Sequence, residues 1–345
     1  MPTYDVVIVG GGLIGAACAD AAAGEGLSVC LLEAGALARE ASWAGAGILN
    51  PIHPWDYPAP LLELVGPAIA EHLRCAEDLW GRTGIDVELV QSGLILMGGA
   101  AERAATWHRG EPQRWVDAAA EEPALKEGGS GLLLPHVYQI RNHRLARALL
   151  EGARRRGAAI RAHVPVLALR PDGVATAQGP VLAGSVVVCA GAWTARLCPG
   201  LPVEPVRGQI LLYQGHARRM VVFPDGSYMV PRRDGRLLFG STLEQAGFDS
   251  RPTEEACRWL EGLAGRYLGL GPQALLAAWA GLRPGTPGRV PFIGRLPDQE
   301  AVLVAAGHYR NGILLAPLTG RLLADLLCGR DPGIDLTPFQ PAATA

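Results

Sequence analysis

The sequence predicts an α/β protein in which a domain built on a parallel sheet is interleaved with an α+β domain built on an antiparallel sheet. Three observations lead to this fold class. Residues 4–9 form a near-continuous apolar run before a glycine-rich turn, as in a strand buried on both faces. Two similar apolar runs follow much later, at residues 186–193 and 301–306. Between them lie short strands joined by tight turns, which favour an antiparallel sheet.

The turn after the first strand predicts a dinucleotide site. Gly10 allows the turn, Gly12 lets the backbone approach a pyrophosphate, and Gly15 lets the following alanine-rich helix pack close to the strand. A second apolar strand, residues 29–33, ends in Glu33, whose carboxylate is placed to accept hydrogen bonds from a ribose. This order of elements favours an ADP-containing dinucleotide over a plain βαβ turn.

The next stretch predicts a ligand-facing segment and then the first part of the second domain. Residues 42–49 are small enough to lie close against a ligand, and the prolines of residues 51–58 exclude helix and sheet interior. We expect a helix over residues 61–80, with Leu73 among its apolar positions, and a strand over residues 87–97. Irregular structure with short helical pieces is expected over residues 98–136.

In the second half, Asn142 is the expected N-cap of a helix that runs to Arg156. Residues 158–169 and 174–181 are expected strands on either side of an Asp172–Gly173 turn. The expected antiparallel strands are residues 210–213, 228–231 and 237–239. A helix is expected over residues 253–267, and the final unit is a strand, a loop over residues 307–311 and a helix over residues 312–327.

Composition excludes several classes of protein. With 345 residues, two domains are expected, and 49% hydrophobic against 19% charged residues describes a well-buried soluble enzyme. The net charge of -2 gives no reason to expect a nucleic acid or an anionic membrane as partner.

The seven cysteines form no CxxC pair, so we expect no disulfide framework and no metal site, and a cytoplasmic location. The first apolar run has no basic residues before it, and Arg321 and Asp325 interrupt the last one, so neither is a leader or a membrane span.

The dinucleotide is predicted to be FAD. A second glycine motif for a nicotinamide is missing, and the late loop and helix over residues 307–327 place a helix N-terminus toward the core. Unpaired N–H groups and the helix dipole at such an end favour the anionic N1/C2=O edge of a reduced flavin. A simple NAD-binding module is the alternative.

The expected FAD-binding domain is of the Rossmann type, like that of glutathione reductase, and is discontinuous. It comprises residues 1–50, 137–203 and 281–345. Residues 51–136 and 204–280 form the expected substrate-binding domain.

Arg283 is the main candidate for binding substrate, because it follows an apolar stretch and a buried guanidinium requires an anion. That anion is either a neighbouring acidic side chain or a carboxylate that arrives with the substrate, and the sequence leaves both open. Arg310 has the same ambiguity. Tyr228 either adds a hydroxyl to the site or is a core tyrosine.

No side-chain acid or base is expected to be catalytic. The sequence contains no nucleophile elbow, metalloprotease motif, phosphate-binding loop or paired carboxylates at helical spacing. His308 is the one obvious base, and its alternative role is a hydrogen bond to loop backbone. A hydride passed to flavin N5 needs no base if the amine arrives neutral, so positioning is the expected work of the protein.

Together these residues resemble the D-amino-acid oxidase-like flavoenzymes, and more narrowly the glycine oxidases of thiamine biosynthesis. The resemblance runs nearly end to end. Its most discriminating blocks are residues 279–287 and 307–317. The other blocks are residues 9–15 with Glu33, 42–49, 54–55, 188–193, 205–209, 228–232 and 240–242.

The resemblance implies a non-covalent FAD, because the block after Arg283 contains Thr286 and no cysteine. The implied cofactor-binding residues are Gly10, Gly12, Leu13, Ile14, Gly15, Glu33, Ala34, Ala41, Ser42, Ala46, Gly47, Ile48, Val166, His308, Tyr309, Arg310, Asn311, Gly312, Ile313 and Leu314. The implied substrate-binding residues are Arg283, Tyr228, Arg310, Asn50 and Leu243. Asn50 and Leu243 vary in such enzymes, so the choice among glycine, sarcosine and small D-amino acids stays open.

The implied reaction is oxidation of a small amino acid by O2 to a 2-oxo acid, ammonia or an amine, and H2O2. Its product would supply the glycine imine or glyoxylate for the thiazole of thiamine, with a thiazole synthase as a possible partner. We also expect a homo-oligomer. The alternatives are a dehydrogenase that passes electrons to a quinone and a non-catalytic FAD-binding protein.

Overall fold

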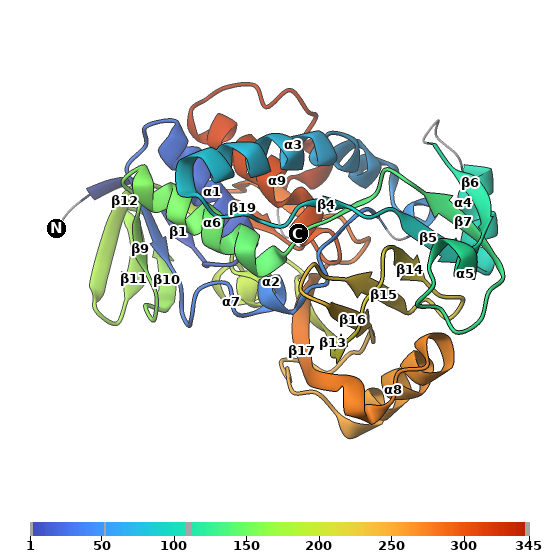
Figure 1. Ribbon diagram of the computed structural model, residues 1–345. Helices are drawn as coiled ribbons and strands as arrows, with labels where there is room; N and C mark the ends of the chain where they lie inside the picture. Colours follow the sequence, from blue (N-terminus) through green and yellow to red (C-terminus); the bar gives the residue numbers. More distant parts are fainter. Residues whose placement is uncertain (1–2, 52, 108–111, 342–345) are drawn as a thin grey trace.

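The computed structural model describes residues 3–51, 53–107 and 112–341, and predictions that fall on the remaining positions lie outside the described part. Two large sheets form the molecule (Figure 1), with the parallel one at the left of the view and the antiparallel one at the right. A small third sheet contains β3 (Ile48–Leu49), β8 (Tyr138–Gln139) and β4 (Val90–Gln91).

The parallel strands of the first sheet lie in the order β9–β2–β1–β12–β19. Antiparallel strands β10, β11 and β18 extend it at its margins. The bounds are β1 (Thr3–Val9), β2 (Val29–Leu32), β9 (Ala159–Arg161), β10 (Val166–Arg170), β11 (Gly173–Thr176), β12 (Gly179–Val188), β18 (Phe292–Leu296) and β19 (Gln299–Ala306). The predicted parallel sheet, with late strands returning beside the first, is therefore present.

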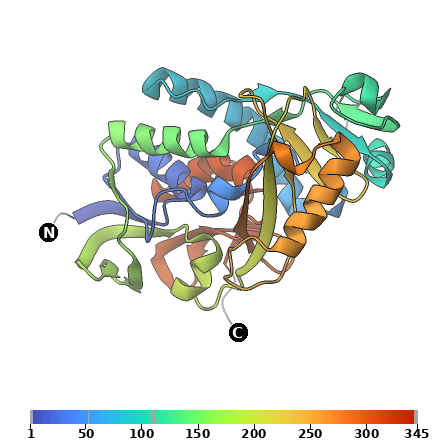
Figure 2. The same ribbon diagram turned by 60° about the horizontal axis from the view of Figure 1, so that its bottom comes forward.

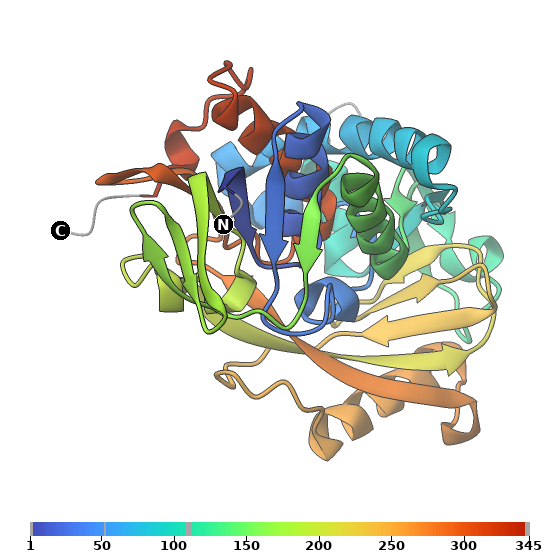
Figure 3. The same ribbon diagram turned by 90° about the vertical axis from the view of Figure 1, so that its left-hand side faces the viewer.

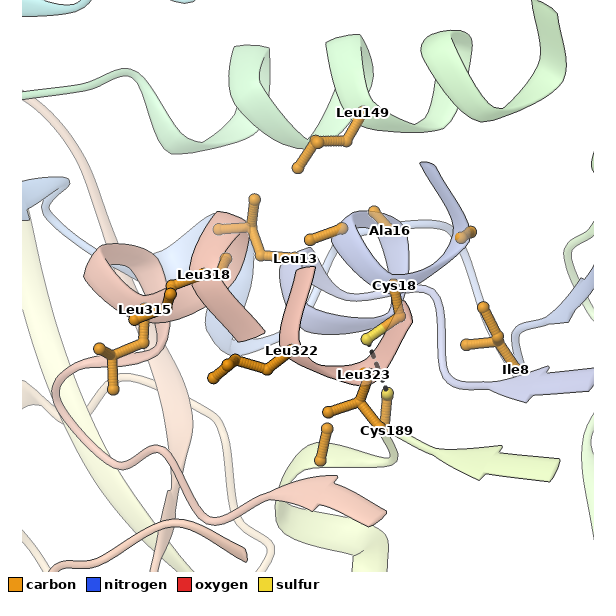
Figure 4. Close-up of a cluster of buried hydrophobic side chains, with 14 of the residues drawn as sticks. Ile8, Leu13, Ala16, Cys18, Leu149, Cys189, Leu315, Leu318, Leu322 and Leu323 are labelled. Atoms are coloured by element: carbon orange, nitrogen blue, oxygen red, sulfur yellow. Dashed lines mark hydrogen bonds between the residues drawn. The ribbon is translucent and has the colours of Figure 1, made fainter. Parts of the chain in front are cut away.

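Helix α1 (Leu13–Gly24) lies between α6 (Asn142–Arg155) and α9 (Gly312–Leu327) over one face of this sheet (Figure 4). Its small side chains let the neighbours approach, so that Leu149 of α6 and Leu322 of α9 share one buried cluster with Leu13. Gly15 is essential to the packing against β1, because a Cβ there would lie 1.9 Å from the carbonyl oxygen of Gly10.

Helix α3 (Ala59–Thr83) packs against α6 and α9 and confirms the helix expected over residues 61–80. Its buried face consists of Leu61, Leu64, Ala68, His72 and Leu79. Leu73, expected among the apolar positions of the helix, does not belong to this face, since its side chain is 42% exposed. It lies next to buried His72, and consecutive helical residues point about 100° apart.

The second sheet has the order β17–β13–β16–β15–β14–β5–β7–β6. The bounds are β5 (Leu94–Met97), β6 (Arg114–Asp117), β7 (Ser130–Leu134), β13 (Glu204–Gln214), β14 (Met220–Val222), β15 (Tyr228–Pro231), β16 (Arg236–Gly240) and β17 (Leu275–Gly285). Helix α8 (Glu254–Leu268), capped by Thr253, covers part of it (Figure 2). The long strands β13 and β17 run side by side (Figure 3).

Two sequence predictions for the second domain are wrong. The strand expected over residues 87–97 is two short strands, β4 and β5, separated where Gly93 adopts a left-handed φ of 67°. Residues 98–136 contain the expected short helical pieces but are not otherwise irregular, because β6 and β7 pair within the large sheet. The remaining elements are α2 (Ala41–Ala44), α4 (Gly99–Trp107), α5 (Ala118–Glu121), α7 (Thr194–Leu197) and the 3-10 turns at Pro54–Asp56, Gly191–Trp193, Pro272–Ala274 and Thr337–Phe339.

The predicted N-cap role of Asn142 is also wrong. Arg141 occupies the N-cap position of α6, and no side chain caps that end. The Asn142 amide instead donates to the carbonyl oxygens of Ser42 and, at 3.0 Å, Trp43. Helix α6 therefore holds the segment that follows the dinucleotide turn.

Each large sheet is assembled from separate stretches of the chain. The predicted domain boundaries stay predictions. The one at residue 281 falls inside β17, which continues in the antiparallel sheet to Gly285.

Candidate functional site

A cavity of about 630 Å³ lies at the carboxyl ends of the parallel strands and extends to the second sheet. Val9, Leu32, Cys189 and Ala306, which end or follow four of these strands, all line it. This is the position at which open α/β sheets bind their ligands, and the volume suits a cofactor with a small substrate. The site is therefore where the fold predicts it.

Glycines and one carboxylate form the dinucleotide end of the cavity. Gly10 has a φ of 108°, and a Cβ there would lie 2.4 Å from the carbonyl oxygen of Cys189. The Glu33 carboxylate accepts hydrogen bonds from the backbone N–H groups of Gly11 at 2.6 Å and Gly35 at 2.8 Å. Each carboxylate oxygen keeps a second lone pair, and Glu33 lines the cavity, so it remains an acceptor for ligand hydroxyls.

Arg232 fixes the next wall of the cavity. Its guanidinium donates to the carbonyl oxygen of Ala46 at 2.7 Å, to Gln139 Oε1 at 2.9 Å and to the Ile140 carbonyl oxygen at 3.2 Å. Burial lowers the pKa of Arg232 to about 10, so it keeps its charge at neutral pH. Nothing in the sequence pattern gave this residue a role, because its partners come from two distant segments, at residue 46 and at residues 139–140.

Gly47 lies beside this contact and requires a glycine. Its φ is 72°, and a Cβ would lie 2.0 Å from the carbonyl oxygen of Ile140. The Ile140 backbone N–H also donates to the Gly47 carbonyl oxygen at 2.8 Å. Asn142 thus holds the first residues of the 42–47 segment, and Arg232 and Ile140 hold its last ones.

The N-terminus of α9 forms a further wall, with Gly312 and Ile313 lining the cavity. No side chain caps this end, because the side chain of the N-cap residue Asn311 instead accepts a hydrogen bond from Tyr57 Oη at 2.9 Å. The first-turn N–H groups and the helix dipole are therefore directed at the cavity, which favours an anionic group there.

His308 is a structural residue of the loop before α9. It is buried, and its Nε2 lies 3.1 Å from Thr319 Oγ1 on that helix. Burial lowers the pKa of His308 to about 3, so the ring stays neutral. The partner is a side chain rather than the backbone expected as the alternative, and the ring joins the loop to α9.

His72 supports the same helix end from α3. Its Nε2 lies 2.9 Å from the carbonyl oxygens of both Ile313 and Leu314. Pro317 has no N–H to donate to the Ile313 carbonyl four residues earlier, so that oxygen needs an outside donor. Nε2 therefore carries the proton, and Nδ1 finds no hydrogen-bond partner among the described residues. Burial lowers the pKa of His72 to about 4.

Lowering the pH from 7 to 5 is expected to destabilise the protein through these two histidines. Their folded pKa values lie below the ordinary 6.5, so below pH 6.5 the unfolded chain binds protons that the folded chain does not. The contribution of the two neutral histidines to the free energy of unfolding is therefore complete above pH 6.5 and is lost as the pH falls toward about 4. One pKa unit corresponds to about 1.4 kcal/mol, so His72 accounts for about 2 kcal/mol by pH 5.

Urea unfolding followed by tryptophan fluorescence at pH 7 and pH 5 measures this loss. His72→Gln keeps an N–H donor and cannot titrate in this range, so its free energy of unfolding should fall by about 2 kcal/mol less than that of the wild type. Equal losses in the two proteins would show that His72 is not a buried neutral group.

Arg283 lines the opposite wall of the cavity on β17. Its Nη1 donates to the carbonyl oxygens of Arg207 at 3.3 Å and Thr242 at 3.2 Å, and its Nη2 donates to Ser241 Oγ at 2.8 Å. Burial lowers the pKa of Arg283, opposed by the nearby Tyr228 hydroxyl. Among the residues that the structure describes, Arg283 forms no ion pair with an acidic side chain.

This arrangement decides between the two anions left open by the sequence. A guanidinium has five N–H donors, and the hydrogen bonds to Arg207, Thr242 and Ser241 engage three of them, while the Tyr228 hydroxyl also interacts with the group. These are all neutral oxygens, so the charge of Arg283 remains for an anion, and a guanidinium can bind a carboxylate in a bidentate manner. The geometry therefore favours a ligand carboxylate over a structural ion pair.

Most of the predicted cofactor-binding residues meet at the cavity. Those that line it are Gly10, Gly12, Leu13, Ile14, Glu33, Ala34, Ala41, Ser42, Ala46, Gly47, Ile48, Val166, His308, Tyr309, Arg310, Gly312 and Ile313. Gly15 and Leu314 do not line it, because they pack in the core beneath. Asn311 lines a smaller neighbouring pocket.

The predicted substrate residues divide in the same way. Tyr228 is buried and lines the cavity together with Asn50, Arg310 and Arg283. Leu243 does not, because its side chain is 57% exposed and lines the smaller pocket. The lining residues to which the sequence gave no site role include Tyr57, Trp193, Arg196, Gly208 and Gly281. Gly208 and Gly281 pair directly across β13 and β17, a relation that no local pattern encodes.

The cavity fits FAD. It offers a carboxylate acceptor beside the glycine turn and an uncapped helix N-terminus. Cys189 is the one cysteine among its lining residues, and the hydrogen bond with Cys18 and burial both raise the pKa of its thiol. A thiol held protonated is a poor nucleophile, so the fit is to a non-covalent flavin.

Comparisons with known proteins agree with this fit. A family model described as "DAO: FAD dependent oxidoreductase" matches residues 5–326. The chain is 38% identical to "Glycine oxidase" of Pseudomonas aeruginosa, over 98% of each chain. It is 34% identical to "Bifunctional protein ThiO/ThiG" of Synechocystis sp., over 98% of this chain and 54% of that protein. The crystal structure of glycine oxidase from Geobacillus kaustophilus aligns with a TM-score of 0.93, 35% identity and 100% coverage of both chains. These similarities confirm the predicted fold class and cofactor.

Proposed function

Because the chain belongs to the DAO family of FAD-dependent oxidoreductases, we propose that it catalyses the oxidative deamination of glycine or of another small amino acid, such as sarcosine or a small D-amino acid. Arg283 carries this proposal. It is a cation at the wall of the cofactor cavity, its hydrogen bonds are to neutral oxygens, and no acidic side chain in the described part of the chain neutralises it.

When bound, FAD supplies the acceptor for a hydride from the substrate Cα, and its reoxidation by O2 yields H2O2. The work of the protein is positioning. Arg283 binds the substrate carboxylate, Tyr228 adds a hydroxyl beside it, and the buried walls exclude water from the reacting carbon. His308 has its Nε2 engaged by Thr319 and stays neutral, so it takes no proton from the substrate.

A peroxide assay with glycine, sarcosine, D-alanine and D-proline tests the proposal. The expected result is H2O2 formation with at least one of them and anaerobic loss of the yellow flavin colour with the same substrate. Rapid dye reduction with little peroxide would instead identify a dehydrogenase that serves a quinone. A flavin that no amino acid bleaches would identify a non-catalytic FAD-binding protein.

Three further features belong to the same proposal. In the described part of the chain, no helix is long and apolar enough to cross a membrane. The seven cysteines are all free, which supports the cytoplasmic location expected from the sequence. Since one relative combines the names ThiO and ThiG in a single protein, we infer that the product supplies a thiazole synthase partner with the glycine imine or glyoxylate. A homo-oligomeric state stays a prediction.

Replacing Glu33 with glutamine is expected to weaken FAD binding at least tenfold. The change removes the negative charge. In the wild type both backbone N–H groups donate to carboxylate oxygens, whereas in the variant one of them faces the N–H₂ group of the amide. A hydrogen bond to a charged group contributes about 1.5–3 kcal/mol, and 1.4 kcal/mol corresponds to a tenfold change. The measurement is titration of the apoprotein with FAD, followed by flavin fluorescence.

Asp5→Asn is the matched control. This carboxylate lies at the opposite end of β1, is exposed, and bonds to Ser28 far from the cavity. It should leave the dissociation constant of FAD unchanged. Equal affinities of wild type and Glu33→Gln would remove Glu33 from the cofactor site.

A further inference from the structure

A second pocket of about 220 Å³ lies beside the cofactor cavity. Tyr57, Tyr309 and Arg310 line both, so the two spaces adjoin at these residues. The other lining residues are His53, Asp56, Leu61, Leu243, Arg289 and Asn311. The chemistry proposed above uses neither this pocket nor Arg289.

The pocket carries an excess of positive charge. In the described part of the chain, neither Arg289 nor Arg310 forms an ion pair, whereas the one carboxylate that lines the pocket, Asp56, pairs with Arg103 at 2.9 Å. Burial raises the pKa of Tyr57, and both Arg310 and Arg289 oppose that shift, so the two guanidinium groups act on the same side chain. An anion in the pocket would face two uncompensated cations.

The backbone places Arg289 at a conformational cost. Gly288 and Arg289 are both left-handed, with φ values of 73° and 59°, and the Arg289 N–H closes the turn on the Thr286 carbonyl oxygen at 3.1 Å. A non-glycine residue in this region costs about 1 kcal/mol or more. A glycine would avoid that cost, so the position favours a role for the arginine side chain itself.

The pocket lies close to the carboxylate anchor. The Tyr309 backbone N–H donates to the carbonyl oxygen of Pro284 at 3.0 Å, which joins the pocket wall to the residue after Arg283. The charge of Arg310 also lowers the pKa of Arg283, after the larger effect of burial. Arg310 thus stands between the anchor at Arg283 and the second cation at Arg289.

We propose that this pocket binds a second carboxylate of the substrate, so that the enzyme accepts amino dicarboxylates. The proposal rests on the function proposed above, with Arg283 holding the carboxylate next to the oxidised carbon. The second carboxylate, on the amino group or on the side chain, pairs with Arg289 and Arg310. For iminodiacetate the balanced reaction is iminodiacetate + O2 + H2O → glyoxylate + glycine + H2O2, in which one C–N bond breaks and O2 is reduced.

Binding to the FAD-loaded protein under anaerobic conditions tests the pocket separately from turnover. Calorimetric titration compares iminodiacetate with its monoamide, and D-aspartate with D-asparagine. Each pair differs only in the charge of the second group. We expect the wild type to bind at least one dicarboxylate tenfold or more tightly than its amide, and the preferred pair identifies whether the carboxylate sits on the amino group or on the side chain.

Arg289→Gln is expected to reduce that preference at least fivefold. Arg258→Gln removes the same charge from the exposed face of α8, where Arg258 pairs with Glu254, and should preserve the preference. Equal binding of acid and amide in both pairs, or a preference that survives Arg289→Gln, would overturn the inference.

Peroxide assays on the same proteins separate the two proposals. Oxidation of glycine without any preference for a dicarboxylate would overturn the second pocket alone. Preferential binding of a dicarboxylate without oxidation of any amino acid would overturn the proposed function and leave the pocket standing.

Discussion

Arg283→Ala is expected to fold and to retain its yellow FAD, but to lose at least a hundredfold in kcat/KM for its amino-acid substrate, mainly through KM. The variant removes the guanidinium that lines the cavity, and no other cation on β17 replaces it. Two charge-assisted hydrogen bonds of about 1.5–3 kcal/mol each correspond to about a hundredfold or more. Steady-state peroxide kinetics measure the loss.

Arg283→Lys provides the matched comparison. It keeps the positive charge and loses the planar fork that supports bidentate binding, so it should recover only part of the activity. Methylamine, which has no carboxylate, should be as poor a substrate for the variants as for the wild type. Unchanged KM values for glycine or D-alanine in Arg283→Ala would remove the carboxylate role from this residue.

The dinucleotide half of the site could be predicted because its determinants are local. The turn at Gly10, the close packing at Gly15 and the acceptor at Glu33 all depend on two consecutive strands and the helix between them. Such a unit closes within a short stretch of chain, so its pattern is visible in the sequence.

Residues whose partners are distant in the sequence were predicted poorly. Asn142 suits an N-cap by residue type, yet its amide reaches carbonyls of residues 42 and 43. The strand β6 was missed because it is mostly exposed and lies at the edge of the sheet, where β7 is its one neighbour. In both cases tertiary contacts override local preference.

The role of Arg283 shows the same limit. The sequence predicted a cation that needs an anion, and two partners stayed open. Strand β13 and the segment after β16 decide which groups approach its guanidinium. The groups that they bring are carbonyl and hydroxyl oxygens rather than an acidic side chain. Leu243, three residues after β16, was expected in the cavity but lies in the second pocket for the same reason: the direction of a loop side chain is decided by distant packing.

Gly208→Ala is expected to displace the guanidinium of Arg283 without disturbing the fold. A Cβ at this position would lie 2.1 Å from Nη1, 2.2 Å from Nη2 and 2.3 Å from Cζ of Arg283. Gly208 lies in strand β13, opposite Gly281, and its φ is not in the left-handed region, so alanine fits the backbone. The three nearest atoms all belong to the end of a flexible side chain, and that end must move.

The displaced guanidinium no longer presents two donors to the substrate carboxylate in the same place. A misplacement of about 1 Å in a positioning group can reduce the rate about a hundredfold, so we expect a loss of this order in kcat/KM with unchanged FAD affinity and melting temperature. Gly262→Ala in α8 is the control, since a Cβ there meets nothing within 4 Å. Normal kinetics in Gly208→Ala would mean that the guanidinium does not rest against this glycine, whereas loss of FAD binding or stability would mean that the strand, and not the side chain, has moved.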